Sequence, residues 1–263
     1  MTYLRRLAEA ADGHRRIIWA LLMRELATRY GRSNIGFLWL IMEPLVFAGL
    51  VSLLWRTIRA PYEYGIPVVP FVVTGYMPLI LFRQSVSYSV GAVTANQALL
   101  YHRQITPLHL FIGRAFVEFI GVTLAFCVIV TGLNLVGMMS PPKDILMVYG
   151  GWLLLTWIVF GLSTIVGALA EIFEFMDKFV SVLTYIMVPL SGSFFMVSWL
   201  PPRYREIVLF LPFIHCFELI RRGFFGEFIT AYYNVPYAVI WAAGLTLVGL
   251  SLVQFVRGRV EVQ

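Results

Sequence analysis

Charged side chains are scarce in this chain of 263 residues: Asp, Glu, Lys and Arg together make up 13% of it, whereas apolar residues make up 60%. Neither of the two lysines, Lys143 and Lys178, follows the glycines that a phosphate-binding P-loop requires. Cys127 and Cys216 are too few and too widely separated to indicate a disulfide framework. The sequence therefore predicts neither a nucleotide site nor a structure held together by disulfides.

Catalytic motifs are also missing. The chain contains no HExxH, GxSxG or CxxC pattern, and the four histidines are not spaced as a metal cluster: His14, His102, His109 and His215. We therefore predict no catalytic residue, no metal site and no cofactor on this chain. If the protein uses ATP, a separate subunit has to bind it.

Long apolar runs are what the chain has in abundance. A helix needs about 20 apolar residues to cross the hydrocarbon core of a bilayer. Six runs of this order are present, at Ile35 to Trp55, Pro67 to Val93, Thr106 to Gly137, Ile145 to Ala170, Phe179 to Pro202 and Phe228 to Val256. They leave no room for a second, water-soluble domain of ordinary size. We predict an all-α, polytopic membrane protein whose permease-like domain, residues 33–258, has six transmembrane helices.

The distribution of basic residues predicts the orientation. Seven of the twenty Lys and Arg residues precede Ser33, which places the N-terminus in the cytoplasm by the positive-inside rule. Six spans then return the C-terminus, with Arg257 and Arg259, to the same side, and residues 259–263 form a cytoplasmic tail. The net charge of +6 is therefore explained by basic residues on the cytoplasmic side of the membrane, and we expect no nucleic acid as a partner.

The N-terminal segment, residues 1–32, has the pattern of an amphipathic helix. Trp19, Met23, Leu26 and Tyr30 recur at spacings of four, three and four, with polar residues opposite. Such a helix lies along the membrane surface. Two roles stay open, simple anchoring or a surface that guides an anionic, lipid-bearing substrate or docks a cytoplasmic partner.

Two connecting segments differ from simple loops. Residues 95–110 combine helix-forming residues with an aromatic and basic tip, from Tyr101 through His102 and Arg103 to Gln104, and a break near Pro107. This composition suits insertion into a partner's groove, although it also suits an ordinary cytoplasmic loop.

The second such segment, residues 201–234, contains an uncharged run from Ile207 to Phe217 that is too short to span a bilayer. Prolines open and interrupt it, which predicts a re-entrant pair of short helices on the periplasmic side, and thus an outer gate or vestibule rather than a surface lid. The candidate gate residues are Arg203, Arg205, Arg221 and Arg222.

Charged residues inside the predicted spans are costly and need a partner or a function. Glu43, Arg83 and Glu118 lie at similar depth, and Arg114 stands one helical turn before Glu118. One possibility is a structural ion pair of Arg83 with Glu43 or Glu118, with Arg114 as a competing partner. The other is that Arg83 faces a pathway for an anionic substrate.

Aromatic residues make up 16% of the chain, and many cluster near the ends of predicted spans. Most fit an interfacial belt or core packing, but an inward-facing subset is suited to stack on sugar rings. With Arg83, the candidate pathway residues are Tyr76, Phe82, Tyr88, Phe194, Phe195 and Trp199.

The segment RELATRYGRSNIGFLWLIMEPLVF, from Arg24 to Phe47, resembles the opening of permease subunits of type-2 ABC exporters for capsular polysaccharide and O-antigen, most closely the KpsM-type capsule permeases. The layout of the whole chain is similar as well. The resemblance implies a homodimer in the bacterial inner membrane that exports a lipid-linked, acidic capsular polysaccharide. It also implies two separate ATPase subunits that bind ATP and Mg²⁺, and periplasmic and outer-membrane export proteins if the host is Gram-negative.

The same resemblance implies roles for two regions. Residues 95–110 would contain the coupling segment that contacts the ATPase, with Tyr101 to Gln104 at its tip. The lipid-linked substrate would enter near Arg24, Arg29, Tyr30, Arg32 and Ser33.

Other functions stay open on the residues alone. The same architecture serves other cargoes, such as O-antigen, a teichoic-acid precursor or a drug. A membrane-embedded lipid or sugar transferase is a different class, but the chain lacks a convergent acid, base or metal cluster for it.

Overall fold

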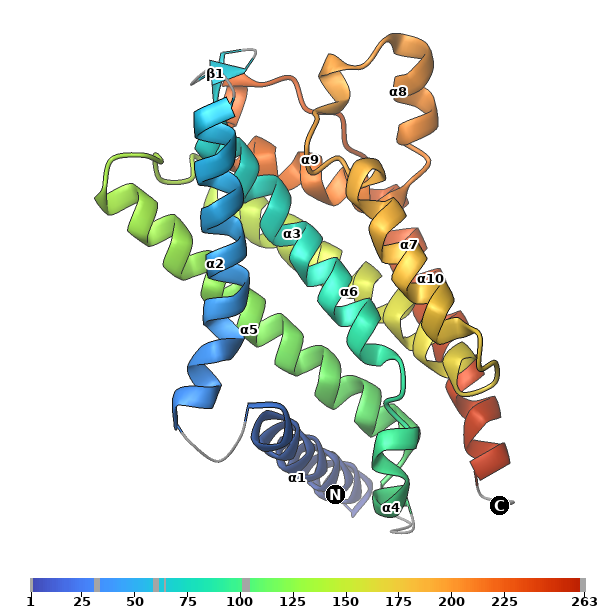
Figure 1. Cartoon of the computed structure of the whole chain (residues 1–263). Coiled ribbons are helices and arrows are strands. Elements are labelled where there is room, and N and C mark those ends of the chain that lie inside the picture. The colour runs from blue at the N-terminus through green and yellow to red at the C-terminus, as the bar shows by residue number, and fades with distance from the viewer. Residues whose placement is uncertain (1, 31–33, 59–61, 64, 101–104, 261–263) are drawn as a thin grey trace.

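The structure is a computed structural model, and it describes the chain except residues 1, 31–33, 59–61, 64, 101–104 and 261–263. Nearly all of the described chain is helical (Figure 1). In chain order the elements are α1 Thr2–Tyr30, α2 Asn34–Ile58, β1 Tyr62–Glu63, β2 Ile66–Pro67, α3 Val68–Ser89, η1 Thr94–Asn96, α4 Gln97–Leu100, α5 Pro107–Leu135, α6 Ile145–Ala170, α7 Met176–Leu190, η2 Val197–Trp199, α8 Pro202–Val208, α9 Pro212–Phe225, η3 Gly226–Phe228 and α10 Val235–Val260. The prediction of an all-α, polytopic membrane protein is confirmed, apart from the hairpin of β1 and β2.

The long helices form one bundle, with α3 running through its middle between α2 and α7 (Figure 1). Almost every side chain of α3 is buried, because α2, α5, α6, α7 and α9 all contact it. Helix α10 lies against α6 where glycines allow close approach: a Cβ atom added at Gly161 would lie 2.9 Å from the Leu245 Cβ atom. Helix α1 and the last turns of α10 lie at one end, and α8 and α9 lie at the other (Figure 1).

Four described helices are long and apolar enough to cross a membrane: α3, α5, α6 and α10. Helix α2 adds a shorter apolar stretch, Ile41–Trp55. The predicted fifth span, Phe179 to Pro202, is wrong as a continuous helix. Helix α7 ends at Leu190 after 15 residues, or about 22 Å, less than the roughly 30 Å of a hydrocarbon core. Gly192, at φ 76°, turns the chain out of the helix. The total of six spans stays a prediction.

The sixth apolar run begins at Phe228, but α10 begins at Val235, directly after the predicted outer segment of residues 201–234. Asn234 precedes this helix, and its side-chain oxygen accepts a 3.0 Å hydrogen bond from the backbone N–H of Tyr237. This contact is an N-cap, which defines the helix start better than the apolar run does. The two short helices predicted within residues 201–234 are present as α8 and α9.

Candidate functional site

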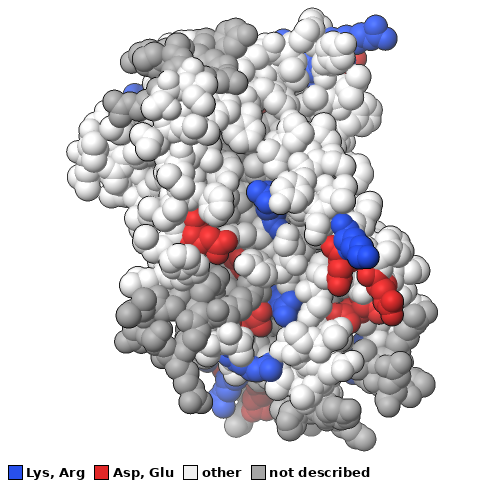
Figure 2. Space-filling view, in the orientation of Figure 1, with Lys and Arg blue, Asp and Glu red and all other residues white. Residues whose placement is uncertain are grey.

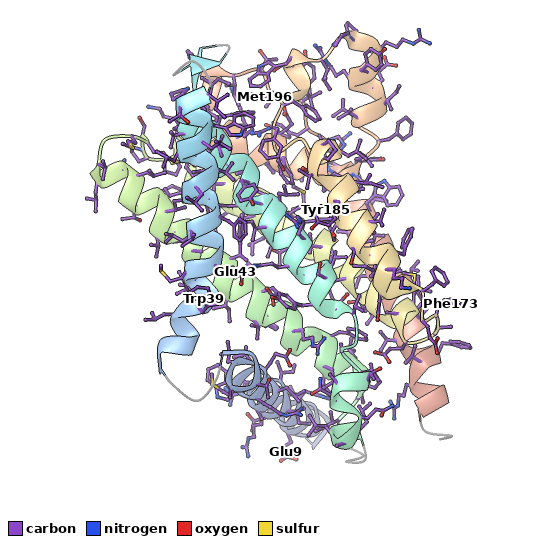
Figure 3. All side chains as sticks on the ribbon, in the orientation of Figure 1. Glu9, Trp39, Glu43, Phe173, Tyr185 and Met196 are labelled. Carbon is purple, nitrogen blue, oxygen red and sulfur yellow. The ribbon has the colours of Figure 1, made fainter. Side chains whose placement is uncertain are left out.

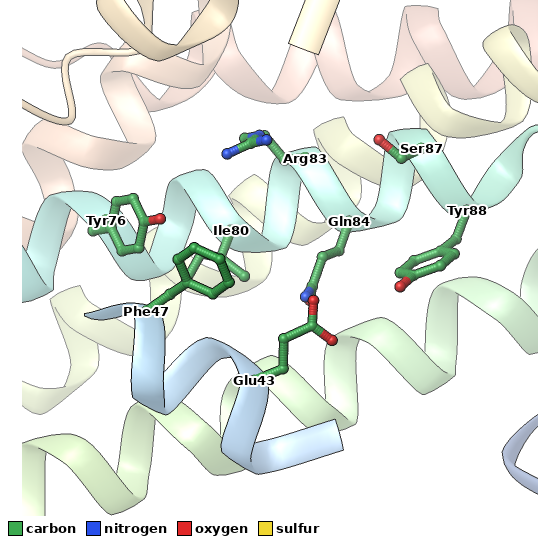
Figure 4. Close-up of a pocket in the computed structure, with 8 residues that line it drawn as sticks. All are labelled: Glu43, Phe47, Tyr76, Ile80, Arg83, Gln84, Ser87 and Tyr88. Carbon is green, nitrogen blue, oxygen red and sulfur yellow. The ribbon is translucent and has the colours of Figure 1, made fainter. Parts of the chain in front are cut away.

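A pocket of about 240 Å³ opens between α2 and α3 (Figure 4). Helix α3 supplies most of its lining, from positions three and four residues apart that together cover a wide arc of the helix. The lining residues are Glu43, Phe47, Tyr76, Ile80, Arg83, Gln84, Ser87 and Tyr88. The structure therefore brings together Glu43 and three of the predicted pathway residues, and we call this site the Arg83 pocket.

Arg83 and Glu43 share this pocket, but neither forms an ion pair within 4.0 Å among the described residues. In Figure 4, Gln84 points toward Glu43, whereas Arg83 lies on the side of α3 away from α2. The Arg83 guanidinium is 5.5 Å from the ring centroid of Tyr185 on α7, within reach of a cation–π interaction. The predicted bridge from Arg83 to Glu43 or Glu118 is thus absent among the described residues. Arg83 lines the pocket instead.

The pocket interrupts an otherwise apolar face of the bundle. Figure 2 shows charged side chains in the middle of this face, with uncharged ones above them and further charged ones toward the right edge and the lower end. Helix α2 contributes exposed apolar residues beside the pocket: Phe47 is 55% exposed and Leu50 is 59% exposed. In Figure 3, Glu43 and Tyr185 lie on this same side of the bundle. A charged pocket within an apolar face is unfavourable against lipid.

The other predicted pathway aromatics have different positions. The ring of Phe194 stacks on Trp55 at 5.2 Å and lies 6.4 Å from Tyr76, so it adjoins the pocket. Phe82 is only 3% exposed and packs 5.8 Å from Phe213 of α9, so it belongs to the core and does not line the Arg83 pocket. Trp199 packs 4.9 Å from Phe71.

Arg221, a predicted gate residue, is completely buried instead. Its guanidinium donates 2.7 Å hydrogen bonds to the backbone carbonyl oxygens of Gly192, Ser193 and Phe195. It also lies 4.2 Å from the ring centroid of Phe71. Burial lowers the pKa of Arg221 to about 10, so this residue remains a cation at neutral pH. Arg221 therefore supports the irregular segment after α7 and does not line a vestibule.

Two more of the predicted gate arginines also bind backbone. Arg205 donates to the Leu200 carbonyl oxygen at 3.1 Å and to the Tyr232 hydroxyl at 2.7 Å. Arg222 donates to the Gly226 carbonyl oxygen at 2.6 Å. Only Arg203 is exposed among these four. The predicted gate role thus does not fit the buried Arg221 and stays a prediction for the other three arginines, of which Arg205 and Arg222 also supply donors to irregular backbone.

Sequence reasoning missed Glu218, which supports the same region. This residue is 1% exposed and accepts hydrogen bonds from the backbone N–H groups of Val197 at 3.1 Å and Tyr232 at 3.0 Å. Burial raises the pKa of the Glu218 carboxyl group. The available signal was its spacing of three from Arg221, which puts two charges on one side of an otherwise apolar helix.

At the other end of the bundle, α1 is attached to α5. The Arg114 Nε atom lies 3.1 Å from the Glu25 carboxylate, and Arg114 also donates to the carbonyl oxygens of Tyr88 at 2.6 Å and Val90 at 3.1 Å. The ion pair of Arg114 in the structure therefore joins two helices far apart in sequence, an outcome that the spacing of Arg114 and Glu118 did not predict. Glu118 itself is buried in α5.

Apolar side chains reinforce the attachment of α1, and Leu26 of the predicted apolar stripe is among them. Leu22 packs with Val117 of α5, whereas Trp19 is 61% exposed and Met23 is 42% exposed. His14 lies 2.8 Å from His109 of α5, between ring nitrogens. Among the described residues, Trp19 and Met23 are thus exposed and available to a membrane surface.

The predicted coupling segment is held from two directions. Arg24 of α1 donates a hydrogen bond to the side chain of Asn96. The Glu171 carboxylate, at the end of α6, accepts from the Thr94 hydroxyl at 2.7 Å and from the backbone N–H of Val93 at 3.1 Å. The predicted short helix is present here as η1 and α4.

Several predicted residues lie outside the part of the chain that the structure describes. They are Arg32 and Ser33, the tip residues Tyr101, His102, Arg103 and Gln104, and the side chains of Arg29 and Tyr30.

Comparison with known proteins relates this chain to transporters. The family model for ABC-2 type transporters matches residues 16–225. The capsule polysaccharide export inner-membrane protein CtrC of Neisseria meningitidis is 39% identical over 95% of this chain and 94% of its own. The protein BexB of Haemophilus influenzae, with the same description, is 36% identical over 94% of each chain. The polysialic acid transport protein KpsM of Escherichia coli is 26% identical over 89% of this chain and 90% of its own.

Proposed function

We propose, from the premise that this chain belongs to the ABC-2 type transporter family, that the Arg83 pocket lies on the route of an exported polysaccharide. The chain is an inner-membrane permease for capsular polysaccharide export. Its similarity to CtrC and BexB extends over nearly its whole length, so the assignment covers the entire permease.

The observation that carries the route is the position of Arg83 and Glu43 on an apolar face. A charged side chain near the bilayer centre costs at least about 2.5 to 3.5 kcal/mol, so such a face favours contact with water or protein over lipid. Tyr76 and Tyr88 add hydroxyl groups and aromatic surface to the same pocket. This combination suits a polymer with hydroxyl groups and negative charge.

A second copy of the chain would enclose this face and complete the pathway. The exposed apolar residues of α2 would then pack against the second copy, and the two Arg83 pockets would border one channel. Arg83 attracts the acidic groups of the polymer, while the aromatic residues let successive sugar rings pass without a single fixed site.

Energy for transport comes from a separate ATPase subunit that binds ATP and Mg²⁺. The segment around η1 and α4 receives the motion of that subunit. Arg24 and Glu171 both hold this segment, so its displacement acts on α1 and α6 together. Coupling then depends on contacts whose donors and acceptors lie far apart in the sequence.

Replacing Arg83 tests the route. Arg83→Ala should lower the amount of polysaccharide on the cell surface by about tenfold, equivalent to about 1.4 kcal/mol of lost interaction with the polymer. Polymer should accumulate inside the cell, and Arg83→Lys should retain part of the export. Arg203→Ala, at an exposed arginine of α8, is the matched control. Normal export by Arg83→Ala at normal membrane abundance would refute the proposed route.

A further inference from the structure

A second cavity, of about 470 Å³, lies among α8, the start of α9 and the residues that lead into α10. It is at the end of the bundle opposite α1, away from the Arg83 pocket (Figure 1). Its polar and aromatic lining is Glu206, His215, Tyr232, Tyr233, Asn234 and Tyr237, and we call it the tyrosine cavity. The volume falls within the range of about 300 to 1,000 Å³ that is typical of small-molecule sites.

The lining has the chemistry of a saccharide site. A pyranose ring presents C–H groups on its faces and hydroxyl groups around its edge. Aromatic rings offer apolar surface to such faces, and carboxylate and amide groups bond to the hydroxyl groups. Three tyrosines beside Glu206 and Asn234 supply both kinds of contact within one cavity.

Hydrogen bonds hold the walls of the tyrosine cavity in place. The Nε2 atom of His215 bonds to the Leu209 carbonyl oxygen at 2.9 Å, and its Nδ1 atom accepts from the backbone N–H of Asn234 at 3.1 Å. The Tyr237 hydroxyl donates to the Phe210 carbonyl oxygen at 2.9 Å. The two segments that form the cavity are therefore fixed to each other, and a ligand would bind with little loss of conformational freedom.

Two polar groups in the cavity are not used by these supports. The Glu206 carboxylate and the Tyr233 hydroxyl have no hydrogen-bond partner among the described residues. Both residues are exposed. The groups that support the cavity walls are thus bonded to protein, whereas the Glu206 carboxylate and the Tyr233 hydroxyl are available to a ligand.

We propose that the tyrosine cavity binds one uncharged pyranose unit of the exported polysaccharide as the polymer leaves the bundle. Glu206 accepts hydrogen bonds from two sugar hydroxyl groups, and Tyr233 stacks on the ring. The carboxylate of Glu206 disfavours an acidic unit, so the cavity selects a different part of the polymer from Arg83. This inference rests on the export function but not on the proposed route through the Arg83 pocket.

The test measures binding of oligosaccharides, prepared from the host capsule, to the purified permease–ATPase complex. Tyr233→Ala and Glu206→Gln should each raise the dissociation constant about three- to tenfold, the range of one aromatic or polar contact. Matched controls are Tyr204→Ala, at an exposed tyrosine of α8 outside the cavity, and Glu227→Gln, at a carboxylate whose side chain is 97% exposed. Both controls should bind as the unaltered complex does. Tyr233→Phe keeps the ring if Tyr233→Ala fails to fold.

Unchanged affinity in folded Tyr233→Ala and Glu206→Gln would overturn the proposal. If these variants keep their affinity but no longer cross-link to a periplasmic export protein, the cavity is a protein contact, and the proposal is overturned as well. Arg83→Ala, measured by export to the cell surface as described above, separates the two proposals. Normal export by Arg83→Ala with weaker binding by Tyr233→Ala refutes the Arg83 route alone, whereas the reverse pattern refutes the saccharide site alone.

Discussion

The guanidinium of Arg221 donates a 2.7 Å hydrogen bond to the carbonyl oxygen of Gly192, 29 positions earlier in the chain. Gly192 lies just beyond the end of α7, where the backbone leaves the helix. Carbonyl groups that lose their helical partners need other donors, and water is excluded from this site because Arg221 is completely buried. Arg221 therefore compensates for the early end of α7.

Replacing Arg221 should strongly destabilise the protein. Arg221→Met leaves three carbonyl oxygens without this donor, at a cost of about 1 to 3 kcal/mol for each of the two buried ones, those of Gly192 and Ser193. We expect a large fall in the thermal unfolding midpoint in detergent, and a smaller fall for Arg221→Lys. Arg203→Met, at the exposed arginine of α8, should leave the midpoint unchanged. Equal midpoints for Arg221→Met and Arg203→Met would contradict the structural role.

Two glycines of α6 provide a matched test of helix packing. A Cβ atom at Gly161 would lie 2.9 Å from the backbone nitrogen of Thr246, whereas a Cβ atom at Gly150 would have nothing within 4 Å. Gly161→Ala should lower stability by about 1 to 3 kcal/mol through overpacking. Gly150→Ala should be neutral or stabilising, because alanine favours helix by about 1 kcal/mol over glycine. Denaturant titration gives the free energy of unfolding of both variants. Equal values would show that α6 and α10 pack less closely than in the structure.

The ion pair of Glu25 and Arg114 should hold α1 against α5. Glu25→Gln and Arg114→Met, alone and together, should show a coupling energy of about 0.5 to 3 kcal/mol, because both side chains are largely buried. Proteolysis within α1 should also become faster in each variant. The exposed pair of Asp12 and Arg15 in the same helix is the control, with an expected coupling below about 0.5 kcal/mol. Additive effects at Glu25 and Arg114 would argue against the attachment.

The contact of Glu171 with Thr94 tests the proposed coupling. Glu171→Gln weakens an acceptor of three hydrogen bonds at the segment leading to α4. We expect the complex to keep its ATP hydrolysis while export falls several-fold, since the motion is no longer passed on fully. Glu174→Gln, at an exposed carboxylate three residues later, should preserve both activities. A parallel fall of ATP hydrolysis and export in Glu171→Gln would instead indicate a general loss of structure.

Apolar run length predicted the helical class and several helix positions well. Helix α6 has the predicted bounds, and α3 and α5 lie within the predicted second and third runs. The same criterion failed after Leu190, because it counts apolar residues and does not register that Gly192 turns the backbone. The sixth apolar run likewise begins seven residues before α10, and the prolines and charges of residues 201–234 and the Asn234 cap define the helix start better than run length does.

The candidate pocket was predictable only in part. Tyr76 and Arg83 are seven residues apart on a single helix, so their spacing indicated that they share an environment. Phe82 is the neighbour of Arg83 in sequence, yet it turns toward α9 and the core. Which side of α3 is covered depends on the helices around it, and spacing along one helix does not contain that information.

The sequence alone determined that this protein is a polytopic helical membrane protein, because apolar length and the distribution of basic residues are local properties, and its segment from Arg24 to Phe47 resembles the opening of export permeases. Only the tertiary structure decided the partners of the charged residues. It assigned Arg221 to the carbonyl oxygens after α7 and Arg114 to Glu25, and it left Arg83 facing a pocket. A charge in an apolar bundle has to find a partner in space, and that partner is set by the packing of distant segments.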